Sequence, residues 1–210
     1  MKKLSLALAL VATTLTAQAQ KGSWYIGGNA GFNSTSVTLE DKNGNSVDDV
    51  KQTSWTIAPE VGTFLTDDLS LGLGLNFGGA KADARNAAKD VEKTSLFGGT
   101  LYSRYFFGSG SFRPFMGVNV SYNAGKETLS NISAETENKL SIFGANLNAG
   151  FAYAMSPCVT VVGSFGTLGF QNSVTENETS GAKVKENSFG LDAGTLGNRF
   201  TIGVYYTFKH

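Results

Sequence analysis

Apolar and polar residues alternate with a period of two along much of this chain. Over residues 69–77, leucines and a final phenylalanine occupy every odd position, while serine, glycine and asparagine occupy the even ones. This period is typical of a β-strand, whose successive side chains point to opposite faces. The stretch 189–198 leads toward the last strand, but its alternation breaks, which predicts a bulge or an irregular loop end there. The pattern predicts strands over residues 22–32, 52–65, 69–77, 95–107, 112–122, 140–154, 158–165 and 199–208.

The connections between these strands alternate in length. Strands joined by hairpins in chain order form an antiparallel meander. In outer-membrane barrels the short turns face the periplasm and the long loops face outside, and an even strand count places both chain ends on the periplasmic side. Strands of about 10 residues at roughly 3.3 Å each, tilted about 45°, cross the ~25 Å apolar band of such barrels. Short connections lie at 66–68, 108–111 and 155–157, and long polar ones at 33–51, 78–94, 123–139 and 171–188.

The two faces of the predicted strands indicate which one meets lipid. The less apolar face consists mainly of Gly, Ser, Thr, Asn and Ala, whereas Lys, Asp and Glu concentrate in the long connections. A membrane barrel turns its apolar face outward, and eight strands leave an interior just wide enough for side chains to fill. Bulky rings near the short turns predict an interfacial girdle, with ordinary core aromatics as the alternative. These rings belong to Trp24, Phe64, Tyr105, Phe106, Phe107, Phe112, Tyr206 and Phe208.

Two charged residues, Glu60 and Arg104, lie on the small-residue face of predicted strands. We predict that both face inward and form a structural ion pair across the interior, because isolated charges there would be costly. A gate or an ion path, and exposure at the barrel mouth, are the alternatives. Arg113 and Arg199 begin strands, and either join this network or lie at the rim.

Composition narrows the classes of function. The chain has 210 residues, which fits one domain, with 26 Gly, 3 Pro and a formal net charge of zero. Many glycines and aromatics with few prolines favour packed strands over disorder, and nothing suggests a nucleic-acid partner. The single cysteine, Cys158, excludes an intrachain disulfide and is interpreted as a small apolar residue at a strand start.

The first residues have the pattern of a secretory signal peptide. Lys2 and Lys3 precede an apolar stretch over 4–15, and Ala17 and Ala19 form a small-x-small cleavage site. We predict cleavage after Ala19, with a signal peptide over 1–19 and a barrel domain over 20–210; an uncleaved anchor is the alternative. No later stretch offers 18 apolar residues, so a spanning chain would have to form a closed barrel.

The C-terminal segment, residues 201–208, resembles the assembly signal of outer-membrane barrels. Gly203, Tyr206 and Phe208 occupy the signal's glycine, aromatic and final positions, although two residues follow Phe208. Segments 58–64, 104–107 and 113–115 look like hairpins of small barrels of the OmpX and OmpA-like type. The resemblance implies an eight-stranded antiparallel up-and-down transmembrane β-barrel in the outer membrane of a Gram-negative bacterium, inserted by the barrel assembly machinery. The periplasmic peptidoglycan-binding domain of full-length OmpA proteins is not expected.

No catalytic motif accompanies this pattern. Nucleotide-binding loops, nucleophile elbows and metal-ligand clusters are absent from the sequence, and the only histidine is His210. Barrel enzymes that act on lipids resemble one another in using a histidine near a serine or carboxylate. We therefore expect no enzyme, no cofactor and no metal, but a monomeric structural and surface-interaction protein in contact with outer-membrane lipid and with host or cell-surface ligands through its loops. A narrow pore for ions or small solutes, and a soluble periplasmic ligand-binding barrel, are the alternatives.

Overall fold

The computed structural model describes residues 21–40, 46–84, 91–130, 135–192 and 201–208, without the side chains at 37–40, 46–50, 84 and 192. The predicted signal peptide with Ala17 and Ala19, as well as Arg199 and His210, lies outside these residues. Every regular element within them is a strand. The strands are β1 (Trp24–Glu40), β2 (Ser46–Phe64), β3 (Leu69–Ala84), β4 (Val91–Phe106), β5 (Phe112–Ser130), β6 (Glu135–Ala154), β7 (Val159–Asn177), β8 (Lys183–Asp192) and β9 (Thr201–Phe208).

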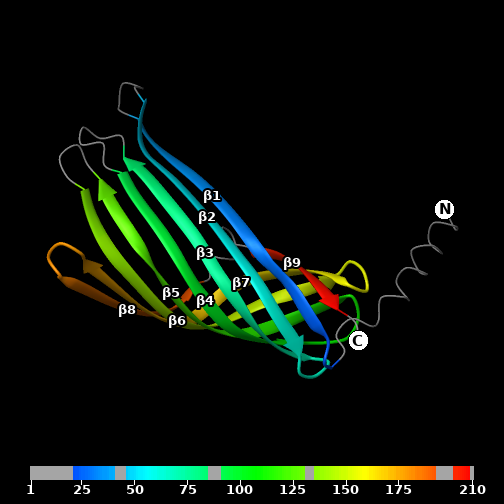
Figure 1. Ribbon diagram of the computed structural model, residues 1–210. Coiled ribbons are helices and arrows are strands. Elements are labelled where there is room, and N and C mark those ends of the chain that lie inside the picture. The colour runs from blue at the N-terminus through cyan, green and yellow to red at the C-terminus, as the bar shows by residue number, and fades with distance from the viewer. Residues whose placement is uncertain (1–20, 41–45, 85–90, 131–134, 193–200, 209–210) are drawn as a thin grey trace.

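All strand pairs are antiparallel, and the sheet closes on itself (Figure 1). Strands β1 to β7 pair in chain order, and β9 pairs with both β7 and β1. Strand β8 pairs with residues 167–176 of β7, and β9 with residues 159–164; among the described residues, β9 closes the sheet onto residues 24–29 of β1, whereas β8 pairs with β7 alone. The predicted fold class, an antiparallel up-and-down barrel, is confirmed.

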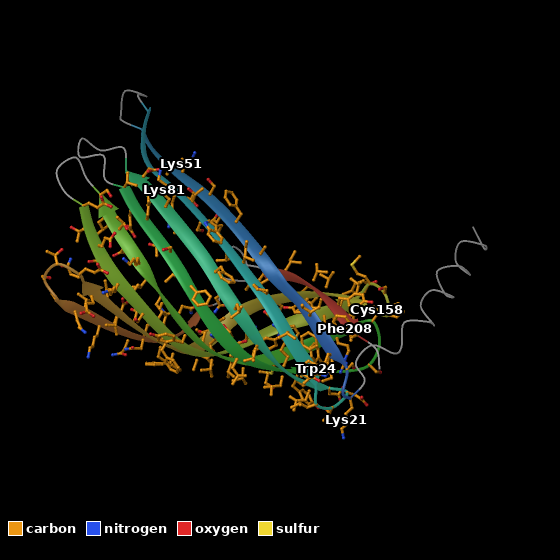
Figure 2. All side chains as sticks on the ribbon, viewed as in Figure 1. Lys21, Trp24, Lys51, Lys81, Cys158 and Phe208 are labelled. Atoms are coloured by element: carbon orange, nitrogen blue, oxygen red, sulfur yellow. The ribbon has the colours of Figure 1, made fainter. Side chains whose placement is uncertain are left out.

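The short turns lie together at one end of the barrel, here called the turn end, and the opposite end is called the rim. In Figure 2, Trp24 and Phe208 lie at the turn end, whereas Lys51 and Lys81 lie toward the rim. The three predicted short turns are confirmed between β2 and β3, β4 and β5, and β6 and β7. Two of them are held by hydroxyls, since Thr66 accepts hydrogen bonds from the backbone of Asp68 and Leu69, and Ser156 does so from Val159.

The strands extend further toward the rim than the sequence predicts. Most residues assigned to long polar connections belong to strands: β5 continues to Ser130, where it pairs with Glu135 of β6. The stretch 189–198, predicted as a bulge or an irregular loop end, is divided: residues 189–192 belong to strand β8, and residues 193–198 lie outside the described part of the chain. The physical reason is that both faces of these extensions meet water, so no apolar alternation marks them, while the backbone hydrogen bonds continue. Besides the three short turns, the strands are separated by residues 41–45, 85–90, 131–134 and 193–200, which are not described, and by the turn at 178–182.

A bulge in β7 explains why the seventh predicted strand stopped too early. Phe165 pairs with Ala149 and Thr167 with Asn148, which leaves Gly166 as an extra residue with φ of 65°. The bulge moves the outward positions from odd to even numbers, so that Leu168 continues the outer face. A strict period of two therefore ends at the bulge although the strand does not.

The outer surface carries two belts of aromatic side chains with apolar residues between them. Outward positions between the belts bear no charged side chain in the described strands. Each hairpin that turns at the rim contributes two directly opposed residues to the upper belt. This pattern matches the apolar band and the flanking girdles of membrane barrels. The upper belt consists of Phe32 with Trp55, Phe77 with Phe97, Tyr122 with Phe143, and Phe170 with Phe189.

The predicted girdle near the turn end divides between two locations. Trp24, Tyr105, Phe107, Phe112, Tyr206 and Phe208 are about half exposed on the outer surface, as predicted. The prediction was wrong for Phe64 and Phe106, which pack inside the barrel. Phe106 faces inward because it alternates with the outward Tyr105 and Phe107.

Candidate functional site: the interior of the barrel

Inward aromatic rings fill the barrel near the turn end. We call this group, Tyr25, Phe64, Tyr102, Phe106, Phe115 and Tyr205, the aromatic plug. Four of its rings lie across a glycine at the directly paired position of the neighbouring strand. A Cβ at any of these glycines would overlap the ring, so the missing side chain is what lets the ring lie flat on the wall. The pairs are Tyr25 with Gly62, Tyr102 with Gly72, Phe115 with Gly150, and Tyr205 with Gly27.

A carboxylate and a guanidinium meet directly beside the plug. Nη2 of Arg104 on β4 lies 2.8 Å from Oε2 of Glu60 on β2, and the two side chains are only 10% and 9% exposed. Oε2 also accepts a hydrogen bond of 2.9 Å from the hydroxyl of Tyr205, and Oε1 one of 3.4 Å from Asn29. The carboxylate is therefore held by side chains from three other strands, β1, β4 and β9. Removing one partner of a buried ion pair typically costs about 3–5 kcal/mol, because the other charge is left uncompensated.

The guanidinium of Arg104 also rests on aromatic faces. Its Cζ lies 4.2 Å from the ring centroid of Tyr102 and 5.5 Å from that of Tyr205. A desolvated cation over a ring face is attracted by the ring quadrupole, by about 2 kcal/mol in favourable cases. Ion pair and plug thus form one unit, with Arg104 between the carboxylate and the rings.

Above this unit the interior is an open polar cavity of about 430 Å³. Its lining comes from eight strands, β1 to β7 and β9, and includes six asparagines and several hydroxyls, with Glu60 and Arg104 at its floor. Asn76 donates to Thr100 and Asn123, each at 2.9 Å, and Asn119 donates to Asn146 at 3.0 Å and Asn148 at 3.2 Å. The asparagines are Asn29, Asn76, Asn119, Asn123, Asn146 and Asn148.

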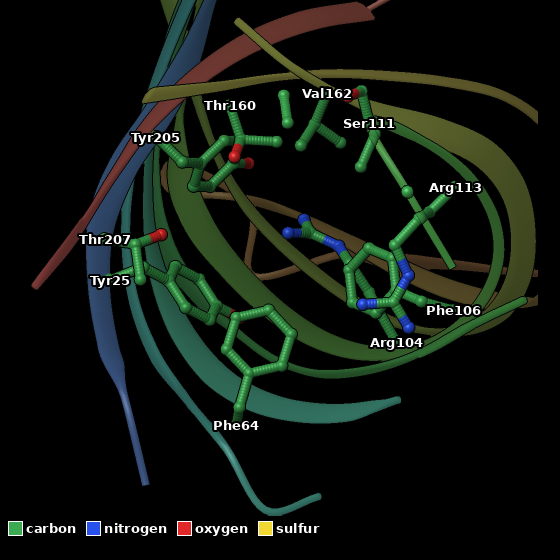
Figure 3. A pocket seen from close by; sticks show the side chains of 13 residues that line it. Tyr25, Phe64, Arg104, Phe106, Ser111, Arg113, Thr160, Val162, Tyr205 and Thr207 are labelled. Atoms are coloured by element: carbon green, nitrogen blue, oxygen red, sulfur yellow. The ribbon is translucent and has the colours of Figure 1, made fainter. Parts of the chain in front are cut away.

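Below Arg104, toward the turn end, a much smaller cavity of about 50 Å³ remains (Figure 3). Its walls include the plug residues Tyr25, Phe64 and Phe106. Arg104 lines this cavity and the upper one, so its side chain separates them. The ion pair and the plug therefore form a septum between the two spaces.

The other predicted site residues lie apart from this septum. Arg113 does not join the Glu60–Arg104 pair; it forms an ion pair with Asp68 and donates to the carbonyl of Asp67 at 3.0 Å, which ties β5 to the turn before β3. Gly203 faces the interior, whereas Tyr206 and Phe208 are half exposed on the lipid-facing surface. Cys158 is a free, partly exposed thiol in the turn before β7.

Sequence reasoning missed two features of the interior. The plug could have been found from inward aromatics that alternate with outward ones, but their glycine partners require knowledge of the strand register. The asparagines at 119, 146 and 148 were assigned to the inner face, yet their convergence depends on β5 and β6 being paired with Asn119 opposite Asn146.

At the rim, exposed charged residues form a network across β5, β6 and the turn after β7. Lys126 lies 3.1 Å from Glu137, and Lys139 lies 3.3 Å from Glu178. Hydrogen bonding to Lys139 lowers the pKa of Glu178, and hydrogen bonding to Glu137 raises the pKa of Lys126. This network tethers the turn to the strand extensions.

Within the described residues, no three His, Cys, Asp or Glu side chains are grouped so that they could hold a metal ion. A helix that is sufficiently long and apolar to span a membrane is likewise absent from that part of the chain.

An antiparallel barrel with a lipid-compatible outer band and a filled interior defines the class of small membrane β-barrels. The family model described as "Outer membrane protein beta-barrel domain" matches residues 4–208, and the chain belongs to this family. It is an outer-membrane protein, seated in the lipid bilayer. The soluble periplasmic barrel that the sequence left open is therefore wrong, and the apolar outer band explains why.

Solved structures with a similar fold are small outer-membrane barrels. OprG from Pseudomonas aeruginosa has a TM-score of 0.53 at 14% identity, over 93% of this chain and 100% of that one. The N-terminal barrel domain of Pseudomonas aeruginosa OprF has a TM-score of 0.45 at 16% identity, over 90% and 98%. Neisserial surface protein A has a TM-score of 0.42 at 14% identity, over 90% and 100%. None of the curated proteins matches the chain.

Proposed function

We propose that this protein is a non-enzymatic, monomeric outer-membrane barrel that is closed to ions and acts as a structural and surface-contact element. The observation that carries this proposal is the septum: a buried ion pair and six packed aromatic rings occupy the lumen between the upper and lower cavities. Eight strands leave little room once side chains of this size point inward. A barrel filled in this way contributes mechanical and lipid contacts to the membrane rather than a path through it.

The absence of catalysis is proposed from the chemistry of the chain. His210 is the only histidine in the sequence, and it follows the final strand, which ends at Phe208. Serine and threonine hydroxyls line the upper cavity, but a hydroxyl needs a nearby base to act as a nucleophile. The carboxylate in that cavity, Glu60, is engaged by Arg104 and Tyr205.

Surface contacts are proposed for the rim. The strand extensions carry exposed lysines and glutamates from β5, β6 and the turn after β7, with Lys126, Lys139 and Glu178 among them. Such a mixed-charge surface is suited to polar partners on a host or neighbouring cell. The strand extensions, rather than long flexible loops, would present it.

Insertion by the barrel assembly machinery is proposed from the last strand. Tyr206 and Phe208 project outward, and their rings contact each other edge-to-face with centroids 5.1 Å apart. We expect Phe208→Ala to lower the yield of heat-modifiable, folded barrel in the outer membrane. Phe112 is a similarly exposed ring near the turn end, and Phe112→Ala should lower this yield less than Phe208→Ala does. Equal yields would argue against a special role for Phe208.

A narrow pore is the second candidate, favoured by one observation. A polar cavity lies on one side of Arg104 and a second cavity on the other, so the Arg104 side chain borders both spaces. A movement of the Arg104 side chain away from Glu60 would connect the two cavities.

Planar-bilayer recording of the purified barrel distinguishes the two candidates. The closed-barrel proposal predicts no stable conductance steps above the bilayer baseline, with a large trimeric porin as the positive control. Frequent, uniform steps from the unmodified protein would overturn it in favour of the pore. Heat-modifiable gel mobility of the same sample verifies that the inserted protein is folded.

A further inference from the structure

The asparagine-lined cavity has more donor capacity than the protein itself uses. Each carboxamide offers two donor hydrogens and two acceptor lone pairs. Asn123, Asn146 and Asn148 accept hydrogen bonds through Oδ1 from Asn76 or Asn119, which leaves the donor hydrogens of their own amides for other partners. All three residues line the cavity, so a bound molecule can accept hydrogen bonds from these amides.

The floor of the cavity adds further unsatisfied polar groups. The hydroxyl of Tyr102, whose side chain is 2% exposed, and Nε of Arg104, which is 9% exposed, have no hydrogen-bond partner among the described residues. Both residues line the cavity. Both atoms are fully buried, so they lie beneath the surface of the floor, and the amides above them are the groups that a bound molecule can reach.

Charge at the site selects the class of ligand. Glu60 and Arg104 are the charged residues in the lining, and they neutralise each other at 2.8 Å. A charged solute would find no free counter-charge there, and an apolar solute would leave the amides unpaired, at a cost of about 1–3 kcal/mol for each buried group. A neutral molecule with many hydroxyls, each both donor and acceptor, matches the amides and the hydroxyls of Thr100 and Ser121.

The cavity has the size and access that such a ligand needs. About 430 Å³ lies within the range of roughly 300–1,000 Å³ that is typical of small-molecule sites. A second cavity of about 380 Å³ shares Ser121, Asn123 and Asn146 with it and is also lined by Gln171 and Ser188 nearer the rim. The two cavities therefore adjoin at these residues, and the second one extends from the asparagines toward the rim.

We propose that the asparagine-lined cavity above the Glu60–Arg104 pair is a binding site for a neutral saccharide. This proposal goes beyond a structural role and does not depend on it, because a barrel that is closed at the septum can still bind a molecule in the cavity above the septum. A free saccharide and the sugar portion of a membrane glycolipid share this chemistry, and the two sources differ in whether the acyl chains are required for binding.

The test is a titration of the folded, isotope-labelled barrel in nanodiscs with maltose, followed by NMR. We expect saturable shifts at the side-chain amides of Asn119, Asn146 and Asn148. Galacturonate, in which a carboxylate replaces the CH2OH group of galactose, should bind more weakly than galactose. A parallel titration with a neutral glycolipid added to the nanodiscs separates the sources: shifts at the same amides only with the glycolipid would assign the site to its sugar portion.

Two variants test the assignment. The double substitution N119L/N146L replaces two lining amides by apolar groups of similar shape and should weaken binding about tenfold, the loss expected for two hydrogen bonds. Asn172→Leu, which removes an amide that donates to Asn187 at 2.7 Å outside the cavity lining, should leave affinity unchanged. Should N119L/N146L fail to fold, the conservative Asn146→Asp variant and the shift map of the unmodified protein still decide. The proposal is overturned if neither maltose nor the glycolipid gives saturable shifts at these amides, or if N119L/N146L binds as well as the unmodified protein.

Discussion

Below Arg104 the interior of the barrel is packed with aromatic rings, whereas above Arg104 it is lined by asparagines that leave an open cavity. The same strands build both halves. In the lower half, the ring of Phe115 lies on the wall because Gly150 opposite it has no side chain, and it packs against Phe106. In the upper half, carboxamides such as Asn119 and Asn146 pair with neighbours along the wall and do not fill the centre. The choice between a ring and a short amide at an inward position therefore decides where a barrel of this size is sealed.

The largest effect should come from breaking the ion pair at the border of the halves. Arg104→Met leaves the carboxylate of Glu60 buried without its cation, and we expect a loss of about 3–5 kcal/mol in the free energy of unfolding. Urea unfolding in lipid vesicles, followed by the fluorescence of Trp24 and Trp55, measures it. The double variant E60M/R104M should regain much of this loss, because both charges are gone. A loss below about 1 kcal/mol for Arg104→Met would mean that Glu60 is solvated from the upper cavity.

A smaller effect should separate two glycines of the same face of β3. A Cβ at Gly72 would overlap the Tyr102 ring, whereas a Cβ at Gly78 would meet its nearest atom at 3.6 Å, an ordinary contact. Gly72→Ala should therefore cost about 1–3 kcal/mol, as overpacking does. Gly78→Ala should be neutral or stabilise by up to about 1 kcal/mol, since glycine is unfavourable within a strand. Equal effects in the same unfolding assay would show that the plug is not rigid.

The smallest effect lies at the rim, outside both halves. Because the pKa of Glu178 is lowered by Lys139, its contribution to stability is present above its unfolded pKa and is lost as the pH falls through the folded value. Lys139→Met should therefore raise the pKa of Glu178 toward its ordinary value of 4.5. A carboxyl NMR titration of Glu178 measures this shift, with little change in global unfolding because the pair is exposed. An unchanged pKa would assign the shift to Lys126, whose Nζ lies 3.6 Å from Glu178.

The lower half shows how far an amino-acid sequence predicts such a barrel. Alternation placed Tyr102, Glu60 and Arg104 on the inner face, since a period of two needs no knowledge of neighbouring strands. It did not identify Phe106 as a plug residue, because proximity to a turn is shared by inward and outward rings. The pairing of Tyr102 with Gly72 could not be predicted, because it depends on the register of β3 against β4.

The upper half marks the other limit of prediction. Beyond the upper belt both faces of the strands meet water, and the alternation of apolar residues ends. Residues such as Lys126 are therefore predicted as loop, although Lys126 pairs with Lys139 between β5 and β6. The bulge at Gly166 has the same consequence within the membrane, by shifting the outward positions from odd to even numbers. Both failures arise where the backbone ladder continues without the side-chain pattern that the membrane imposes.

The contrast between a sealed lower half and an open upper half is tested most directly by cysteine accessibility. Asn146 and Ala152 lie on the same face of β6, but Asn146 lines the upper cavity, while Ala152 is 6% exposed in the packed cluster, at the edge of the small lower cavity. With Cys158 replaced by serine, each position is changed to cysteine and exposed to a small charged thiol reagent in vesicles. The account predicts that N146C reacts roughly tenfold or more faster than A152C, because a buried thiol is inert. Similar rates at both positions would contradict it, since the lumen would then be hydrated, or sealed, along its whole length.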